Sequence, residues 1–333
     1  MAAKILVVDN PESDGRDLSI EHAELGSSAE IVQLTYHDSR DLEKLVTAAS
    51  KCDAVLTDFT PFDSSVIAQL KSCKLISISA TGWDCIDLEA ARKHQVSVCA
   101  VGEYCTEEVA DHTLALILML KRQLLDYHFQ VQRDRSWAFD KINTPARLRG
   151  QTLGIIGFGR IGKAVASRAK SFGIEIIFYD PKIEHSDETL DAKRVSLETL
   201  FETSDIISLH CNADLNNDPI FSHTSFNSLM KKPILINVAR GSLIDEHALA
   251  AALDAGMVQG AALDVLNGEP PKLEENCLLG RTNIVITPHI AFYSEHSIKD
   301  VRMISARNIK YFLEKDYSQV NRFVYKANDI VVE

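Results

Sequence analysis

The chain has 333 residues, 46% hydrophobic and 25% charged, which is typical of a soluble globular protein with room for two domains rather than of a disordered or fibrous one. Its formal net charge is −12 and no run of lysine and arginine stands out, which argues against nucleic acid as a partner. The seven cysteines form no C-x-x-C pair, so we expect no zinc site, no other metal and no disulfide framework, and a reducing, cytoplasmic environment.

The first hundred residues alternate short apolar runs with polar or amphipathic stretches. The runs lie at 4–9, 29–34, 54–57, 75–79 and 96–99. Stretches such as 39–50 and 64–73 are long enough for crossover helices, so the pattern predicts a parallel sheet covered on both faces. The first run is too short for a signal sequence, and we expect no membrane span.

Residues 105–134 are rich in helix formers and predict one long helix, with Thr106 as its N-cap. The segment 114–120 is apolar nearly all round, so it must be buried on more than one side. We therefore expect a homodimer that associates through the 105–134 region.

From residue 152 the alternation of strands and helices resumes. Six apolar runs predict strands at 152–157, 174–179, 205–210, 234–238, 259–264 and 284–287. They match a doubly wound dinucleotide-binding sheet, and an amphipathic helix over 294–316 follows the last of them.

This order predicts an α/β protein of two nested domains. A Rossmann-type doubly wound parallel sheet, residues 101–293, is inserted in a second, flavodoxin-like α/β domain made of residues 1–100 and 294–333. Two connections, near 100 and near 293, would then cross the cleft between the domains and suit a hinge that closes over a substrate.

The stretch "GIIGFGRIGKAVA" places Gly157, Gly159 and Gly162 at the spacing of a dinucleotide-binding turn. The spacing alone also fits a tight turn without a ligand. A strand precedes it, a helix follows, and Asp180 lies 18 residues after the last glycine. An aspartate there accepts the ribose hydroxyls of NAD and repels the 2′-phosphate of NADP by about 4 kcal/mol per unit-charge pair at about 4 Å. We therefore expect NAD (NADH) as the cofactor, with weak use of NADP because Lys182 is near.

Arg240, Glu269 and His289 each follow a predicted strand of the second domain. Taken singly, they are equally a surface arginine, a loop glutamate and a structural histidine. Ligands of open α/β sheets bind at the carboxyl ends of strands, so together the three residues favour the reduction of a 2-keto acid. Arg240 would hold the carboxylate in a planar fork and His289 would give a proton to the carbonyl oxygen. Glu269 would orient the imidazole and favour its charged form.

Six segments carry a resemblance over nearly the whole chain. They are "ATGWDCIDLEAARKHQVSV" (80–98), "YCTEEVADHTLALIL" (104–118), "GFGRIG" with Asp180, "INVARGSLIDEHAL" (236–249), "ALDVLNGEP" (262–270) and "ITPHIAFYSE" (286–295). In these the chain resembles the D-isomer-specific 2-hydroxyacid dehydrogenases, most closely the bacterial D-lactate dehydrogenases in its pocket motifs. The resemblance implies a nested cofactor domain, a dimer, and catalytic roles for Arg240, Glu269 and His289.

The resemblance also implies contacts with the two ligands. The expected cofactor contacts are Gly157, Gly159, Arg160, Ile161, Gly162, Asp180, His210, Cys211, Val238, Ala239 and Asp264, the last of them to the nicotinamide carboxamide. The expected substrate contacts are Thr81, Gly82, Tyr104, Arg240 and Phe292, although the two aromatics also fit core or interface packing. His112 belongs to a family motif and is interpreted as a structural helix histidine. The loop 210–221 departs from the family pattern at 212–214, which affects the adenine side of the site.

The substrate is less constrained than the chemistry. No regulatory domain follows and no basic cluster surrounds the pocket motifs, which favours pyruvate over a phosphorylated acid. Glyoxylate, hydroxypyruvate and phenylpyruvate stay open, since one methylene changes discrimination by only about 1 to 3 kcal/mol. A different class is also open: C-terminal-binding protein corepressors share several of these segments and sense NAD, but they carry tryptophan where this chain has Phe292, and usually long disordered tails.

Overall fold

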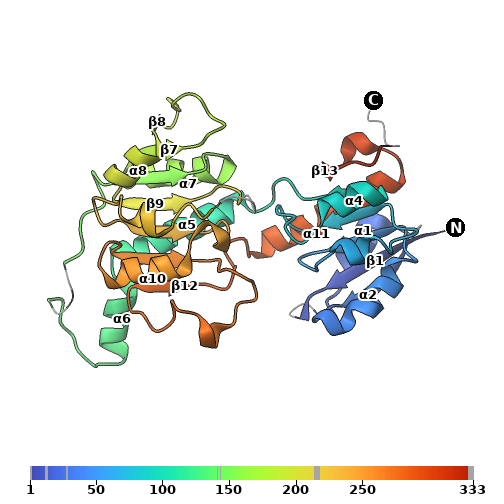
Figure 1. Ribbon diagram of the computed structural model, residues 1–333, viewed down its shortest axis with the longest axis horizontal. Helices are drawn as coiled ribbons and strands as arrows, with labels where there is room; N and C mark the ends of the chain where they lie inside the picture. Colours follow the sequence, from blue (N-terminus) through green and yellow to red (C-terminus); the bar gives the residue numbers. More distant parts are fainter. Residues whose placement is uncertain are drawn as a thin grey trace. The chain divides into compact units, whose positions relative to one another are not determined.

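The computed structural model describes residues 2–11, 14–27, 29–140, 142, 144–213 and 218–328. The chain forms two compact units: residues up to Tyr104 together with those from Ser294 onward, and the continuous stretch Cys105–Tyr293 (Figure 1). The second unit therefore interrupts the first along the sequence. Within the described ranges, no helix combines the length and the apolar character needed to cross a bilayer.

The first unit is a six-stranded sheet in the order β13-β5-β4-β3-β1-β2. Its strands are β1 (Ala3–Asp9), β2 (Ala29–Thr35), β3 (Ala54–Thr57), β4 (Leu75–Ile78), β5 (Ser97–Cys99) and β13 (Phe323–Tyr325). Its helices are α1 (Ser19–Leu25), α2 (Leu42–Ala49), α3 (Ser64–Ile67), α4 (Leu88–His94) and α11 (Glu295–Leu313). Five strands are parallel in the flavodoxin order, and the antiparallel edge strand β13, which follows α11, was not predicted.

Alternating residues of β1 bury against opposite layers of this unit. Leu6 and Val8 pack in the core that includes Leu45 of α2, whereas Ile5 and Val7 face the layer formed by α11. All four strand residues are fully buried. The expected parallel sheet with both faces covered is therefore confirmed.

The second unit is a seven-stranded parallel sheet in the order β12-β11-β10-β9-β6-β7-β8. Its strands are β6 (Thr152–Ile156), β7 (Glu175–Tyr179), β8 (Ala192–Arg194), β9 (Ile206–Leu209), β10 (Ile234–Asn237), β11 (Gly260–Leu263) and β12 (Ile284–Ile286). The order reverses at β6, as in the doubly wound Rossmann fold. The sequence predicted six strands. The seventh, β8, was not predicted because only one of its three residues is buried.

Helices cover both faces of the second sheet (Figure 1). They are α5 (Thr106–Lys121), α7 (Arg160–Lys170), α8 (Leu197–Thr203), α9 (His223–Phe226) and α10 (Glu246–Asp254). Helix α6 (Leu124–Gln132) contacts α5 and contributes no residue to the two cores of this unit. Short 3₁₀ turns lie at Ser39–Asp41, Gly241–Leu243, Leu273–Glu275 and Tyr317–Gln319.

The single helix expected over 105–134 is wrong, because the chain breaks between α5 and α6. Gln123 has a φ of 53°, in the left-handed region, which no continuing helix can contain. The expected burial of α5 is present, since Ala110 and Ile117 are fully buried and the helix contacts both α7 and the sheet.

Candidate active site

The turns after three neighbouring strands carry the arginine, glutamate and histidine expected at the site. Arg240 follows β10, Glu269 follows β11 and His289 follows β12, and these strands are adjacent and parallel. Their carboxyl ends therefore lie at one edge of the sheet, which is where α/β folds bind ligands.

Glu269 and His289 are in direct contact. His289 Nδ1 lies 2.6 Å from Glu269 Oε2, and Leu266 N donates to Glu269 Oε1 at 3.0 Å. Both side chains are about one-third exposed, 34% for the imidazole and 35% for the carboxylate. The glutamate is thus fixed by its own loop and fixes the imidazole in turn.

The electrostatic surroundings keep Glu269 ionised. Partial burial acts to raise the pKa of Glu269, but the hydrogen bond and charge of His289, the Leu266 N–H and the Arg240 guanidinium together outweigh burial. The pKa therefore lies below its ordinary value of 4.5. At neutral pH the carboxylate is anionic and can accept a hydrogen bond from His289 Nδ1.

The backbone of His289 is held in an unusual conformation. Its φ of 52° is left-handed for a non-glycine residue, a state that costs on the order of 1–3 kcal/mol. His289 N donates to Asp264 O at 2.8 Å. The Asp264 carboxylate, only 1% exposed, accepts from Ile290 N at 2.9 Å and Ala291 N at 2.8 Å. Asp264 thus organises the loop that carries His289, a role that sequence reasoning missed, and its nicotinamide contact stays a prediction.

Asn237 and Gly241, neither of them expected, shape the Arg240 turn. The buried Asn237 side chain donates to Arg240 O at 2.8 Å and accepts from Ala239 N at 3.0 Å. A Cβ on Gly241 would collide with the backbone of Leu266 and lie 2.6 Å from Asn267 N. Only glycine therefore lets the loop of Arg240 pack against the loop of Glu269. The signal in the sequence is a polar residue ending an apolar strand and a glycine directly after the arginine.

The glycine turn after β6 has the shape that a dinucleotide requires. Gly157 has a φ of 91°, and a Cβ there would lie 2.6 Å from Cys211 N. A Cβ on Gly162 would collide with the Gly157 carbonyl. Asp180 accepts from Phe158 N and Lys182 N, both at 2.9 Å, so each carboxylate oxygen keeps a lone pair for a ribose hydroxyl. These residues fit NAD, whose pyrophosphate would be held at the N-terminus of α7.

Gly159 tests this fit, because a Cβ added there meets no atom within 4 Å. We expect Gly159→Ala to keep the melting temperature of the free protein while raising the Kd for NADH about tenfold or more, since the methyl group takes space that the pyrophosphate needs. Calorimetric titration with NADH and a thermal melt measure the two effects. Gly15→Ala, at an exposed turn of the first unit, serves as the control for NADH binding alone, because at its φ of 66° the added methyl group strains the backbone and should lower the melting temperature. An unchanged Kd in Gly159→Ala would remove the pyrophosphate from this turn.

His210 and Cys211 follow β9 beside the glycine turn. Burial lowers the pKa of His210 to about 3 and raises the pKa of Cys211 to about 11, so both side chains are neutral at physiological pH. His210 Nε2 lies 2.8 Å from Ser208 Oγ. The unusual loop continues through residues 214–217, which lie outside the described part of the chain.

The remaining expected contacts divide between the units. Arg160 is exposed on the first turn of α7, while Ile161, Val238 and Ala239 are half-buried at the same edge of the second sheet. Phe292 packs edge-on to His289 with ring centroids 6.0 Å apart. Thr81, Gly82 and Tyr104 are half-buried residues of the first unit, the first two in the loop after β4.

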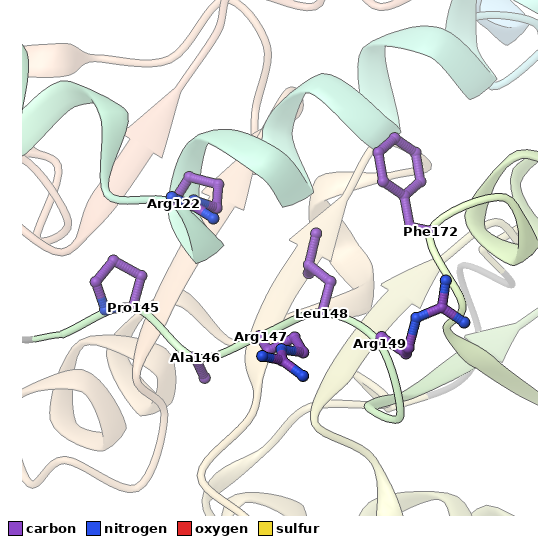
Figure 2. Close-up of a pocket in the computed structure, with 7 residues that line it drawn as sticks. All are labelled: Arg122, Pro145, Ala146, Arg147, Leu148, Arg149 and Phe172. Carbon is purple, nitrogen blue, oxygen red and sulfur yellow. The ribbon is translucent and has the colours of Figure 1, made fainter.

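A separate hollow of about 570 Å³ lies on the second unit (Figure 2). It is lined by Arg122, Pro145, Ala146, Arg147, Leu148, Arg149 and Phe172, none of which belongs to the expected site. Among the described residues, no group of histidine, cysteine, aspartate and glutamate side chains is arranged to hold a metal ion.

Known proteins resemble the chain over most of its length. Residues 114–291 match the NAD binding domain of the D-isomer specific 2-hydroxyacid dehydrogenase family. The chain is 35% identical to C-terminal-binding protein 1 of Caenorhabditis elegans over 89% of its own length, but it spans only 42% of that relative. It is 31% identical to a hydroxypyruvate reductase of Blautia hydrogenotrophica, over 82% of this chain and 86% of that protein.

The whole architecture is also found in solved structures. A D-lactate dehydrogenase from Aquifex aeolicus, solved with NAD and lactic acid, superposes with a TM-score of 0.82 at 26% identity, covering 96% of this chain and 98% of that one. The chain belongs to the D-isomer specific 2-hydroxyacid dehydrogenase family.

Proposed function

We propose that the protein reduces a small 2-keto acid to the D-2-hydroxy acid, with pyruvate to D-lactate as the favoured reaction. The observation that carries the proposal is the contact of His289 with the ionised Glu269, at the strand ends that also hold Arg240. The match of residues 114–291 to an NAD binding domain supports the cofactor. We further propose a cytoplasmic location, supported by seven cysteines that are all free thiols.

Each side chain has one task in this reaction. Bound NADH supplies the hydride that reduces the carbonyl carbon. Arg240 binds the substrate carboxylate bidentately and fixes the carbonyl carbon in position. His289 gives the proton from Nε2 to the carbonyl oxygen, so one hydride and one proton convert the ketone into the alcohol. Glu269 keeps the imidazole oriented through its contact with Nδ1, so that Nε2 is directed to the carbonyl oxygen before the transfer.

The other substrate contacts expected from the sequence are also part of the proposal. The backbone of Thr81 and Gly82 would hold the carboxylate, while Tyr104 and Phe292 would line the pocket. The edge-on packing of Phe292 against the His289 ring supports its place near the reacting carbonyl.

The test is NADH oxidation with pyruvate, glyoxylate, hydroxypyruvate and phenylpyruvate, followed by chiral analysis of the chiral products. We expect the highest kcat/KM with pyruvate and a product of D configuration. A product of L configuration, or no turnover of any of the four acids, would contradict the proposed reaction. A higher kcat/KM with another of the four would replace pyruvate and keep the chemistry.

Cofactor choice is a separate prediction. We expect kcat/KM with NADPH to be about tenfold or more below that with NADH, because the 2′-phosphate meets the Asp180 carboxylate. Steady-state kinetics with both cofactors measure the ratio. Lys182→Ala removes the nearby positive charge, so its ratio should favour NADH further. Equal or better use of NADPH by the unaltered protein would contradict this assignment of Asp180.

A second candidate function is an NAD-sensing binding protein. The 35% identity with C-terminal-binding protein 1 favours it. Its sign would be binding of a short peptide by the first unit without turnover of any keto acid. The same substrate panel therefore separates the two candidates.

We also propose a homodimer that associates through the α5–α6 region. Trp137 and Phe139, in the stretch after α6, are 90% and 87% exposed, which a second copy of the chain would cover. Analytical ultracentrifugation should give a mass about twice the 37.0 kDa of one chain. Trp137→Ala with Phe139→Ala should shift the mass toward one chain, whereas Met230→Ala, an exposed methionine elsewhere, should not. A single-chain mass for the unaltered protein at micromolar concentration would exclude the dimer.

A further inference from the structure

His112 contacts the loop that carries His289, although the proposed reaction gives it no task. It lies on α5, its side chain is 20% exposed, and its Nε2 is 3.3 Å from Thr287 Oγ1 and 3.7 Å from Asp264 Oδ1. Thr287 Oγ1 donates to Asp264 Oδ1 at 2.6 Å. Because the hydroxyl proton of Thr287 is used in that bond, its oxygen accepts from His112, which places a proton on His112 Nε2.

The hydrogen bonds that link His112, Thr287 and Asp264 continue into the loop that carries His289. Asp264 accepts the N–H groups of Ile290 and Ala291 on either side of its carboxylate, and its own carbonyl accepts His289 N. These bonds hold His289 at its left-handed φ of 52°. A strained residue persists only where its surroundings define its conformation, and here Asp264 does so.

Helix α5, which carries His112, is firmly packed in the second unit. Helix α5 packs along α7 and also contacts β10 and β11, so His112 reaches Thr287 from an element fixed to the same sheet. Next to His112, the exposed Asp111 accepts from Arg168 of α7 at 2.6 Å, which ties this turn of α5 in place. A displacement of the Asp264 carboxylate therefore meets resistance from α5 through Thr287.

We propose that His112 is a positioning residue: through Thr287 and Asp264 it holds the 287–291 loop in the conformation that sets His289 against Glu269. The catalytic part of this inference rests on the proposed function. A histidine that merely fills space on α5 would stabilise the fold without acting on this loop, so the two roles differ in what a substitution changes.

The experiment compares variants that keep or remove one hydrogen bond. His112→Gln keeps an N–H near the position of Nε2, and Thr287→Ser keeps the hydroxyl. His112→Leu and Thr287→Val remove them. Thr113→Val is the matched control, because the hydroxyl of this buried threonine of α5 donates only to Val109 O of its own helix at 2.7 Å.

Two readouts decide the inference. Amide hydrogen exchange of Ile290 and Ala291, measured without substrate, should become about tenfold faster in His112→Leu and Thr287→Val. In the same two variants kcat for the keto acid should fall roughly tenfold, with the KM for NADH within about twofold of the original. His112→Gln and Thr287→Ser should restore both values, and the double variant should lose no more than either single one.

The outcomes separate this inference from the proposed function. If the unaltered protein reduces no keto acid, the proposed function fails. The exchange measurement alone then tests whether His112 holds the 287–291 loop in its conformation. Unchanged exchange and kcat in His112→Leu would overturn the inference. Equal losses in His112→Leu and His112→Gln together with a lower melting temperature would also overturn it, because they indicate a purely structural histidine.

Discussion

Replacement of His289 by alanine is expected to lower kcat for keto-acid reduction by about 10²–10⁴-fold, the usual contribution of a positioned general acid. The affinity for NADH should change little, because the cofactor is expected at the glycine turn after β6 rather than on the imidazole. Stopped-flow or steady-state NADH oxidation gives kcat, and fluorescence titration gives the Kd.

The protonation state of Glu269 explains why this neighbouring residue cannot replace His289 as the proton donor. The pKa of Glu269 lies below its ordinary value of 4.5, so at neutral pH this carboxylate accepts hydrogen bonds and has no proton to give. His185→Ala, an exposed histidine of the same unit, is the control and should leave kcat unchanged. Near-normal turnover in His289→Ala would remove the imidazole from its role.

Conversion of Arg240 to lysine is the second large effect. We expect kcat/KM for the keto acid to fall about 10²-fold, with KM rising and kcat falling together, because an ammonium keeps the charge but cannot form the planar fork that orients the carbonyl. The KM for NADH should stay close to its original value. Steady-state kinetics with varied keto acid at saturating NADH measure both constants.

A matched arginine makes the result specific. Arg281 pairs with Asp254 at 2.7 Å on the surface of the same unit, so Arg281→Lys should leave kcat/KM unchanged. If Arg240→Lys retained the kinetics of the unaltered protein, bidentate recognition of the carboxylate by this residue would be wrong.

The sequence predicts those parts of the fold that repeat with a clear period. Runs such as 54–57 and 206–209 contain three apolar residues and one small hydroxyl residue each, and they form fully buried central strands of the two sheets. Strands β8 and β13 are three residues long and lie at sheet edges, where none of their residues except Ala192 is fully buried, so neither forms a run of buried residues like those of the central strands. The break after α5 depends on one left-handed residue, Gln123, whose side chain gives no signal for that conformation.

The candidate site follows the same division. The positions of Arg240, Glu269 and His289 could be inferred because strand ends of one parallel sheet meet at one edge. The residues that support these three side chains could not be inferred from the sequence. Gly241 must be glycine because a Cβ would collide with the backbone of Leu266, 25 residues away in sequence. Asp264 likewise has its partners in the loop after the next strand. Such contacts arise only when the strands have paired.

The insertion of one unit within the other also sets the order in which a growing chain can fold. During translation Cys105–Tyr293 emerges from the ribosome whole before α11 and β13 emerge. The cofactor-binding half can therefore finish first, as domains usually fold as units. Until α11 emerges, Ile5 and Val7 of the amino-terminal sheet lack part of the core that buries them. Ile309 and Phe312 of α11 belong to that core. The nascent polypeptide thus carries an open apolar face until α11 has emerged, and we expect chaperones to bind this face.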